Sequence, residues 1–305
     1  MLTEETDPRP KKVCMEEIEK AVKNFKSHLQ RMGYSKSTVL MLPSCVKEFL
    51  KVQQIKNIPA VTSEQIQTHY EYLQIRPNKI KPGTLSENHI NHHIYGLKLF
   101  FKWLEANGKI QMNPISGLEF PTPKTKPREI LSLKEINQLY ETCENYWQRA
   151  VLGVYYGCGL RRSEGINLNV KDVHFRSSLL YVREGKGAKR RVVPMSESVK
   201  DDLQNYALKE RRSKPGETAF LTGQMGRRVN PKMLVKTLKL LLEKSEIETT
   251  TPERQISLHS LRHSIATHLL ENGLSIENVR DFLGHSFLES TQIYAKVSKD
   301  QLDKL

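Results

Sequence analysis

The chain has 305 residues, of which 48 are Lys or Arg and 34 are Asp or Glu, giving a formal charge of +14 at pH 7. This length favours two domains, each able to bury its own core, and the positive charge favours a polyanionic partner such as nucleic acid. No run of 18 apolar residues and no secretory leader is evident, and the four cysteines are too widely spaced for a zinc knuckle, so we expect a reduced cytoplasmic protein without membrane contact, metal or other cofactor.

Residues 12–118 are predicted to form a helical domain of about four helices. Apolar residues recur at spacings of three and four in its first and last segments, which gives each helix one apolar face. These residues are Met15, Ile18, Val22, Phe25 and Leu29, and then Ile90, Ile94, Leu97, Phe101 and Leu104. Gly33 and Gly108 are expected to close these helices. Ser63 is a candidate cap, and Pro43 indicates a late start or a kink in the second helix.

A basic, proline-rich segment at residues 119–129 is predicted to be the interdomain linker. Prolines at positions 121, 123 and 127 prevent a continuous helix, and the segment offers little apolar surface to bury. Lys124 and Lys126 are predicted DNA contacts, because a basic linker can lie along a phosphate backbone.

Residues 130–305 are predicted to form the second domain. Ser132 and Glu135 have the spacing of a capping box, which predicts a helix directly after them. The apolar period then changes within residues 171–195, where two or three short strands are expected, two of them flanking a glycine-rich turn.

Helices return after this sheet. Two of them are expected to end near Gly273 and at Gly284, because a glycine follows the last periodic apolar residue in each case. The predicted fold class is therefore mainly α with a small β-sheet (α+β).

The last fifty residues contain side chains suited to phosphodiester chemistry. His259 and Arg262 lie three residues apart, so on a helix they share one face, which we expect to turn away from the apolar stripe toward a ligand. His285 follows a glycine, and Tyr294 comes nine residues later. Arginine binds two phosphate oxygens, histidine moves protons and tyrosine is a nucleophile. Ionising a phenol at pH 7 costs about 4 kcal/mol, which nearby cations can offset without a metal.

Five motifs in register resemble those of the tyrosine recombinase, or phage integrase, family, especially its Xer-like branch. They are Gly159-Leu160-Arg161-Arg162-Ser163-Glu164, Gly185-Lys186-Gly187-Ala188-Lys189, His259-Ser260-Leu261-Arg262-His263, Leu283-Gly284-His285 and Thr291-Gln292-Ile293-Tyr294-Ala295. The resemblance spans both predicted domains. It implies an N-terminal helical core-binding (SAM-like) domain that clamps DNA and a C-terminal catalytic domain.

The resemblance also implies how the phosphate is bound. Arg161 and Arg262 would clamp the scissile phosphate and stabilise the charge of the transition state, and His285 would hydrogen-bond a phosphate oxygen. Arg162 and Gly165 depart from the family, which usually places apolar residues at these positions, so the packing beside Arg161 is expected to differ.

The implied reaction is site-specific recombination of duplex DNA. Tyr294 would attack to form a 3′-phosphotyrosyl bond, Lys186 would protonate the leaving 5′ oxygen, and His259 would assist proton movement at the nucleophile. The ester conserves the energy of the broken bond, so rejoining needs no ATP. By resemblance, four protomers join two duplexes and exchange strands through a Holliday junction. Whether the free protein is a monomer is left open by the sequence.

Several alternatives remain at this point. The run Lys189, Arg190 and Arg191 is predicted to contact DNA, although such a hairpin is more often simply solvated. The pair His259 and His263 lacks the glutamate of a zinc protease motif. A further cluster, made by His89, His92 and His93, is more typical of a solvated or DNA-facing helix than of a metal site.

Three other functions would also use these residues. They are a nicking-closing enzyme similar to a type IB topoisomerase, a catalytically silent DNA-binding or architectural protein, and a metal-dependent nuclease.

Overall fold

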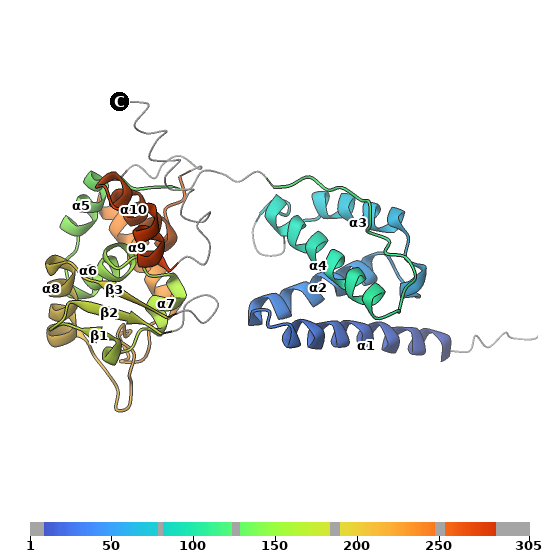
Figure 1. Ribbon diagram of the computed structural model, residues 1–305, viewed down its shortest axis with the longest axis horizontal. Helices are drawn as coiled ribbons and strands as arrows, with labels where there is room; N and C mark the ends of the chain where they lie inside the picture. Colours follow the sequence, from blue (N-terminus) through green and yellow to red (C-terminus); the bar gives the residue numbers. More distant parts are fainter. Residues whose placement is uncertain (1–8, 79–81, 124–128, 184–189, 248–253, 285–305) are drawn as a thin grey trace, which may run out of the picture. The chain divides into compact units, whose positions relative to one another are not determined.

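The chain forms two compact units, residues 1–125 and 126–305. The computed structural model describes residues 9–78, 82–123, 129–183, 190–247 and 254–284, with side chains from residue 16 onward. Helices dominate both units and a small sheet lies in the second, which confirms the predicted fold class (Figure 1). Within these described residues no helix is long and apolar enough to cross a membrane.

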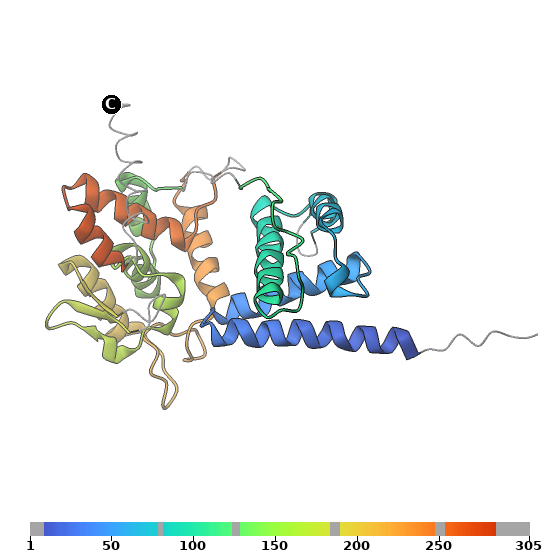
Figure 2. The ribbon, with the colours of Figure 1, turned by 45° about the vertical axis from the view of Figure 1, so that its right-hand side comes forward.

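Helices are the main elements of the first unit. Its elements are α1 (Arg9–Arg31), α2 (Lys36–Val52), the 3-10 turn η1 (Ile58–Ala60), α3 (Ser63–Ile75) and α4 (Glu87–Ala106). Helix α2 packs against both α1 and α4, and α3 packs against α4. Figure 2 shows α1 and α2 side by side in the turned view. Fully buried aromatic and aliphatic side chains fill the space between them, including Phe25, Leu42, Phe49, Leu97 and Phe100.

The ends of these helices follow the local signals in the sequence. Gly33 and Gly108 adopt positive φ just after α1 and α4, which confirms both as stop positions. The predicted cap at Ser63 is wrong by one residue, because the capping residue is Thr62. Its hydroxyl oxygen accepts a hydrogen bond from the backbone N–H of Gln65, and the Gln65 side chain accepts one from the backbone N–H of Thr62. Pro43 is buried inside α2, which begins at Lys36 and therefore has no late start.

The second unit combines a small antiparallel sheet with helices. Its strands are β1 (Val173–His174), β2 (Leu179–Val182) and β3 (Arg191–Pro194), in the order β1-β2-β3. Its helical elements are α5 (Leu133–Glu141), α6 (Tyr146–Leu152), the π-helical turn η2 (Gly153–Gly157), α7 (Arg162–Asn167), η3 (Val170–Asp172), α8 (Glu197–Asn205), the π-helical turn η4 (Tyr206–Glu210), α9 (Pro231–Lys244), α10 (Leu258–Glu271) and α11 (Ile276–Leu283). The predicted strands and the box formed by Ser132 and Glu135 are confirmed.

The turn η2 lies at the centre of the second unit and positions the segment that follows it. It packs against α6, α8 and α10, and α10 in turn packs against α11. The chain leaves η2 through Gly159, whose positive φ lets the backbone turn directly against the Phe282 and Leu283 side chains. A Cβ on this glycine would lie 3.0 Å from Phe282, so a larger residue would push the two segments apart.

Candidate active site

Arg161 stands just before α7 and is fixed by its own helix. The carboxylate of Glu164 accepts the backbone N–H of Arg161 at 2.8 Å and its guanidinium Nη1 at 2.7 Å. The other terminal nitrogen, Nη2, donates to the carbonyl oxygen of Gly284 at 3.1 Å. The Arg161 side chain remains 19% exposed. It is therefore oriented by two parts of the chain and still has access to a ligand.

Arg262 is buried, which differs from the expected orientation of its helix face. Its side chain is 1% exposed, and it donates to the carbonyl oxygens of Gly159 and Leu283, the latter at 2.6 Å. The reason is that the loop before Arg161 and the end of α11 both close over this face of α10. His259, one turn earlier, is exposed and lines a groove of about 680 Å³ beside α9. Of the two, His259 is the side chain that the structure leaves accessible.

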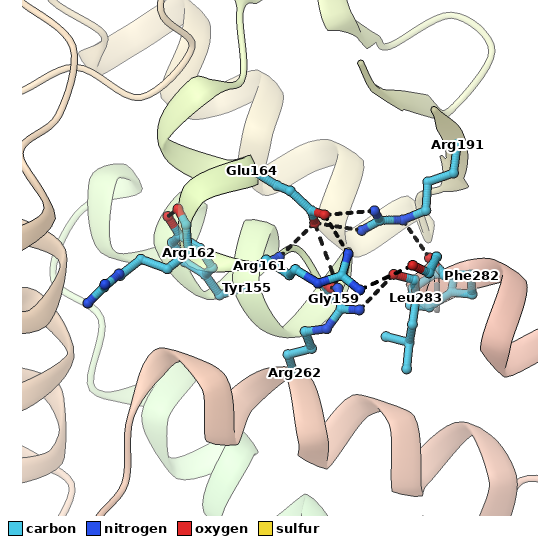
Figure 3. Close-up of polar contacts among 10 residues, drawn as sticks. Tyr155, Gly159, Arg161, Arg162, Glu164, Arg191, Arg262, Phe282 and Leu283 are labelled. Carbon is cyan, nitrogen blue, oxygen red and sulfur yellow. Dashed lines mark hydrogen bonds and ion pairs between the residues drawn. The ribbon is translucent and has the colours of Figure 1, made fainter. Parts of the chain in front are cut away.

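Glu164 collects three guanidinium groups around one carboxylate, as Figure 3 shows. Arg161 and Arg191 hydrogen-bond to it, and Nη1 of Arg262 lies 3.7 Å from its Oε2. Burial alone would raise the pKa of Glu164, but the bonds and charges of Arg191 and Arg161 outweigh this effect and lower the pKa to about 2. Three cations and one ionised carboxylate leave a net charge of +2. Arg161, the most exposed of the three side chains at 19%, is the member of the cluster placed to bind an anion such as a phosphate.

The predicted DNA contacts of the hairpin have different surroundings. Arg190 is exposed just before β3. Arg191 is only 8% exposed and bonds Glu164 and the carbonyl oxygen of Phe282. A strand pattern could have indicated this burial, because Arg191 shares a strand face with the buried Val193 and Met195. The sequence interpretation named Glu164 only as part of the motif around Arg161 and missed its place among three arginines.

The remaining predicted site residues lie outside the described part of the chain. They are Lys124, Lys126, Lys186, Lys189, His285 and Tyr294. The sequence places His285 directly after Gly284, whose carbonyl oxygen binds Arg161.

The two histidine clusters indicated by the sequence differ in their surroundings. His259 and His263 stack edge to face with ring centroids 4.6 Å apart, and His263 is buried. The cluster on α4 is not uniformly solvated as expected, since His93 is 2% exposed while His89 and His92 face outward. Among the described side chains, no group of three or more His, Cys, Asp or Glu residues could hold a metal ion.

Gly165, one of the two positions expected to depart from the family pattern, packs closely against a tyrosine ring. Tyr155 lies over this glycine, and an added Cβ would be 2.6 Å from its hydroxyl oxygen. The same hydroxyl donates to the carbonyl oxygen of Arg162 at 3.2 Å. The Tyr155 ring therefore fills the space in which an apolar side chain at position 165 would otherwise lie.

A mainly helical fold with a small sheet that gathers three arginines around one carboxylate is suited to phosphate chemistry, and comparisons with known proteins make the class specific. Residues 129–301 match the phage integrase family. Tyrosine recombinase XerC 2 of Ralstonia nicotianae is 33% identical over 285 residues, covering 88% of this chain and 79% of that protein. Tyrosine recombinase XerA of Pyrococcus horikoshii is 30% identical over 283 residues, covering 92% of this chain and 90% of that protein.

Solved structures share the fold. The Tn1549 transposon integrase in complex with circular intermediate DNA has a TM-score of 0.71 at 19% identity, covering 90% of this chain and 94% of that one. The XerH site-specific recombinase bound to palindromic difH substrate has a TM-score of 0.70 at 16% identity, covering 98% and 88%. The chain belongs to the tyrosine recombinase (phage integrase) family, and its relatives at about 30% identity are Xer recombinases. It is accordingly a DNA-binding enzyme that breaks and rejoins DNA strands.

Proposed function

We propose that this protein is a site-specific recombinase that cleaves and rejoins duplex DNA through a covalent bond to Tyr294. The observation that carries the proposal is the convergence of Arg161 and Arg262, about a hundred residues apart in the sequence, on the buried carboxylate of Glu164. Both guanidinium groups also donate to backbone carbonyl oxygens at the end of α11, those of Gly284 and Leu283, and His285 is the next residue of the chain. A scissile phosphate bound there would meet fixed cations, which stabilise the additional charge of the transition state without reorganisation.

In the proposed cleavage step the phosphoryl group is transferred from the 5′ oxygen of the DNA to the Tyr294 side chain. The phenolic oxygen of Tyr294 attacks the phosphorus, the bond to the 5′ oxygen breaks, and the DNA keeps a 3′-phosphotyrosyl end. His259 assists removal of the phenolic proton, and Lys186 gives a proton to the departing 5′ oxygen. His285 and the two arginines bind the non-bridging oxygens. The reverse reaction with a new 5′ hydroxyl rejoins the strand, and because the ester keeps the energy of the broken bond no ATP is needed. The arginines stabilise the charge and Lys186 supplies the proton, so the proposed step uses no metal.

We also propose that the protein binds and joins DNA in the same kind of protein–DNA complex as the family. The helical domain (12–118), the linker (119–129) and the catalytic domain (130–305) would bind a specific recombination site on duplex DNA, with Lys124, Lys126, Lys189 and Arg190 at phosphates. Four protomers would join two duplexes and exchange strands in pairs through a Holliday junction. The related structures, which hold a circular intermediate DNA and a palindromic difH substrate, support this partner.

Trapping the covalent intermediate tests the proposal. The Tyr294→Phe protein first selects its binding site from a pool of random duplexes. That site is then prepared with a nick next to the cleavage position, so that the short 5′-hydroxyl fragment diffuses away and the adduct accumulates. With the unmodified protein we expect a labelled protein–DNA adduct, and mass spectrometry should show that the 3′ end of the DNA is attached to Tyr294. Its formation should be unchanged by EDTA.

A matched tyrosine variant makes this test specific. Tyr181→Phe changes an exposed tyrosine on β2 and should leave adduct formation intact, whereas Tyr294→Phe should abolish it. An adduct through another residue, or none from the unmodified chain, would refute the proposal. Relaxation of supercoiled plasmids that lack the site would instead favour the topoisomerase-like alternative, and cleavage that requires a divalent ion would favour the nuclease.

A further inference from the structure

Arg191, the first residue of β3, links three separate segments of the catalytic unit. Its Nη1 and Nη2 donate to the two carboxylate oxygens of Glu164 at 3.1 and 2.9 Å. Its Nε donates to the carbonyl oxygen of Phe282 at 2.9 Å. Figure 3 shows the guanidinium between these two partners. Strand β3 is thereby connected both to the start of α7 and to the end of α11.

Each of the three segments leads within a few residues to a group of the proposed chemistry. Glu164 binds both the backbone N–H and the guanidinium of Arg161. Phe282 precedes His285 by three residues, and β3 follows the turn that contains Lys186. One side chain therefore bonds to the segments that carry the first arginine and the second histidine.

The set of contacts requires a guanidinium rather than any positive charge. A planar fork can donate to two carboxylate oxygens and a carbonyl oxygen at once, whereas a lysine ammonium is a point charge on a flexible stem. The stem of Arg191 also packs against Gly284, where an added Cβ would lie 2.8 Å from the arginine Cδ. Both the shape and the length of the arginine are used in this position.

We infer that Arg191 is a positioning residue for strand cleavage, an inference that rests on the proposed function. It holds Glu164 at a fixed distance from the end of α11, and in this way orients Arg161 and the chain that continues to His285. Its role is to preorganise the phosphate clamp from inside the protein, not to contact DNA from the hairpin as the sequence suggested.

Single-turnover cleavage of the nicked site by Arg191→Met and Arg191→Lys tests this role. At saturating protein we expect cleavage to be roughly 10- to 100-fold slower in both variants, since small misplacements of catalytic groups have effects of this size. DNA affinity should stay within about twofold, because the side chain is buried away from a partner. Arg191→Lys keeps the charge, and it decides the question if Arg191→Met does not fold.

A second substrate separates the phosphate clamp from the leaving-group acid. A duplex with sulfur in place of the bridging 5′ oxygen releases a thiolate, which needs no proton. This substrate should restore cleavage to Lys186→Ala but not to the Arg191 variants. Arg211→Met is the matched control, because this arginine also bonds backbone carbonyls, those of Glu217, Ala219 and Phe220, and should lower the melting temperature without slowing cleavage at low temperature.

Two results would overturn the inference while leaving the proposed function intact. One is wild-type cleavage by folded Arg191→Lys, and the other is recovery of the Arg191 variants on the sulfur substrate. Absence of an adduct from the unmodified chain would instead overturn the proposed function itself.

Discussion

Glu164 is an ionised carboxylate held inside the protein by arginines, and this makes it a determinant of stability as well as of the site. Its pKa is lowered to about 2 in the folded chain, against an ordinary value of 4.5. The folded state therefore binds this proton less readily than the unfolded chain. This lowered pKa contributes about 3 kcal/mol to the free energy of unfolding. The contribution is fully present above pH 4.5 and is lost as the pH falls from 4.5 toward 2.

The Glu164→Gln variant should remove this contribution. Arg161, Arg191 and Arg262 would then lack their shared anion, and breaking a buried ion pair from one side typically costs about 3–5 kcal/mol. We expect the free energy of unfolding of the catalytic unit to fall by that amount at pH 7, and its acid sensitivity between pH 4.5 and 2 to flatten. Urea denaturation followed by tryptophan fluorescence at a series of pH values measures both.

An exposed acid provides the control for this variant. Glu141→Gln on α5 removes the same charge from the surface and should change stability by less than about 0.5 kcal/mol. Equal losses in the two variants, or an unchanged acid profile in Glu164→Gln, would contradict the assignment of this carboxylate as the anchor of the arginine cluster.

The site residues show what the sequence can and cannot predict at this scale. The resemblance to the recombinase family, carried by the motifs around Arg161 and Arg262, predicted that both arginines belong to one site. The burial of Arg262 depends on the carbonyl oxygen of Gly159, 103 residues earlier, and such a contact has no local signal. Arg191 lies between these cases, since its strand face did carry a signal.

At the scale of elements, local signals predicted most boundaries. Caps and helix-ending glycines depend on backbone bonds within a few residues, and so the starts of α5 and the ends of α4 and α11 were predicted correctly. The turn η2 was not predicted, because its five-residue π-helical geometry depends on packing against α6, α8 and α10. Tertiary contacts decide such elements.

The contact between α3 and α4 contains two buried histidines that give the first unit a pH dependence. Burial lowers the pKa of His69 to about 4, and burial also lowers that of His93 to about 4, with Glu48 opposing and Arg76 adding to the effect. His89 faces His93 from the same helix. Unfolded histidines titrate near 6.5, so the unfolded chain gains protons first as the pH falls. Stability should be complete above pH 6.5 and decline toward pH 4, by about 3 kcal/mol for each ring.

The His69→Phe variant tests this element. The ring already stacks edge to face on Phe49, and neither of its nitrogens has a hydrogen-bond partner among the described residues. The variant should therefore be at least as stable at pH 7 and should lose about half of the acid sensitivity between pH 6.5 and 4. Thermal melting monitored by circular dichroism across this range measures the change. His92→Gln, at an exposed position on α4, should keep the full sensitivity; equal curves for the two variants would contradict the argument.

At the scale of the whole molecule, each unit has its own core, so the two can respond to conditions separately. The core of the first unit is built from α1 to α4, and that of the second surrounds η2 and the sheet. Acid near pH 5 acts on His69 and His93 in the first. In the second, burial also lowers the pKa of His268, and acid near pH 3 acts on Glu164.

The charge of +14 belongs to the whole chain, and under the proposed function it should govern DNA affinity. Cations that replace counterions on the phosphate backbone make affinity fall with salt, by about a thousandfold between 50 and 200 mM if six phosphates are contacted. Fluorescence anisotropy with Tyr294→Phe, which cannot cleave, measures the slope. Lys124→Gln and Lys126→Gln should each reduce that slope by about one. Lys209→Gln should not, because its ammonium lies over the Tyr146 ring at 5.1 Å. A slope near zero, or equal slopes for all three variants, would argue against the linker lysines as phosphate contacts.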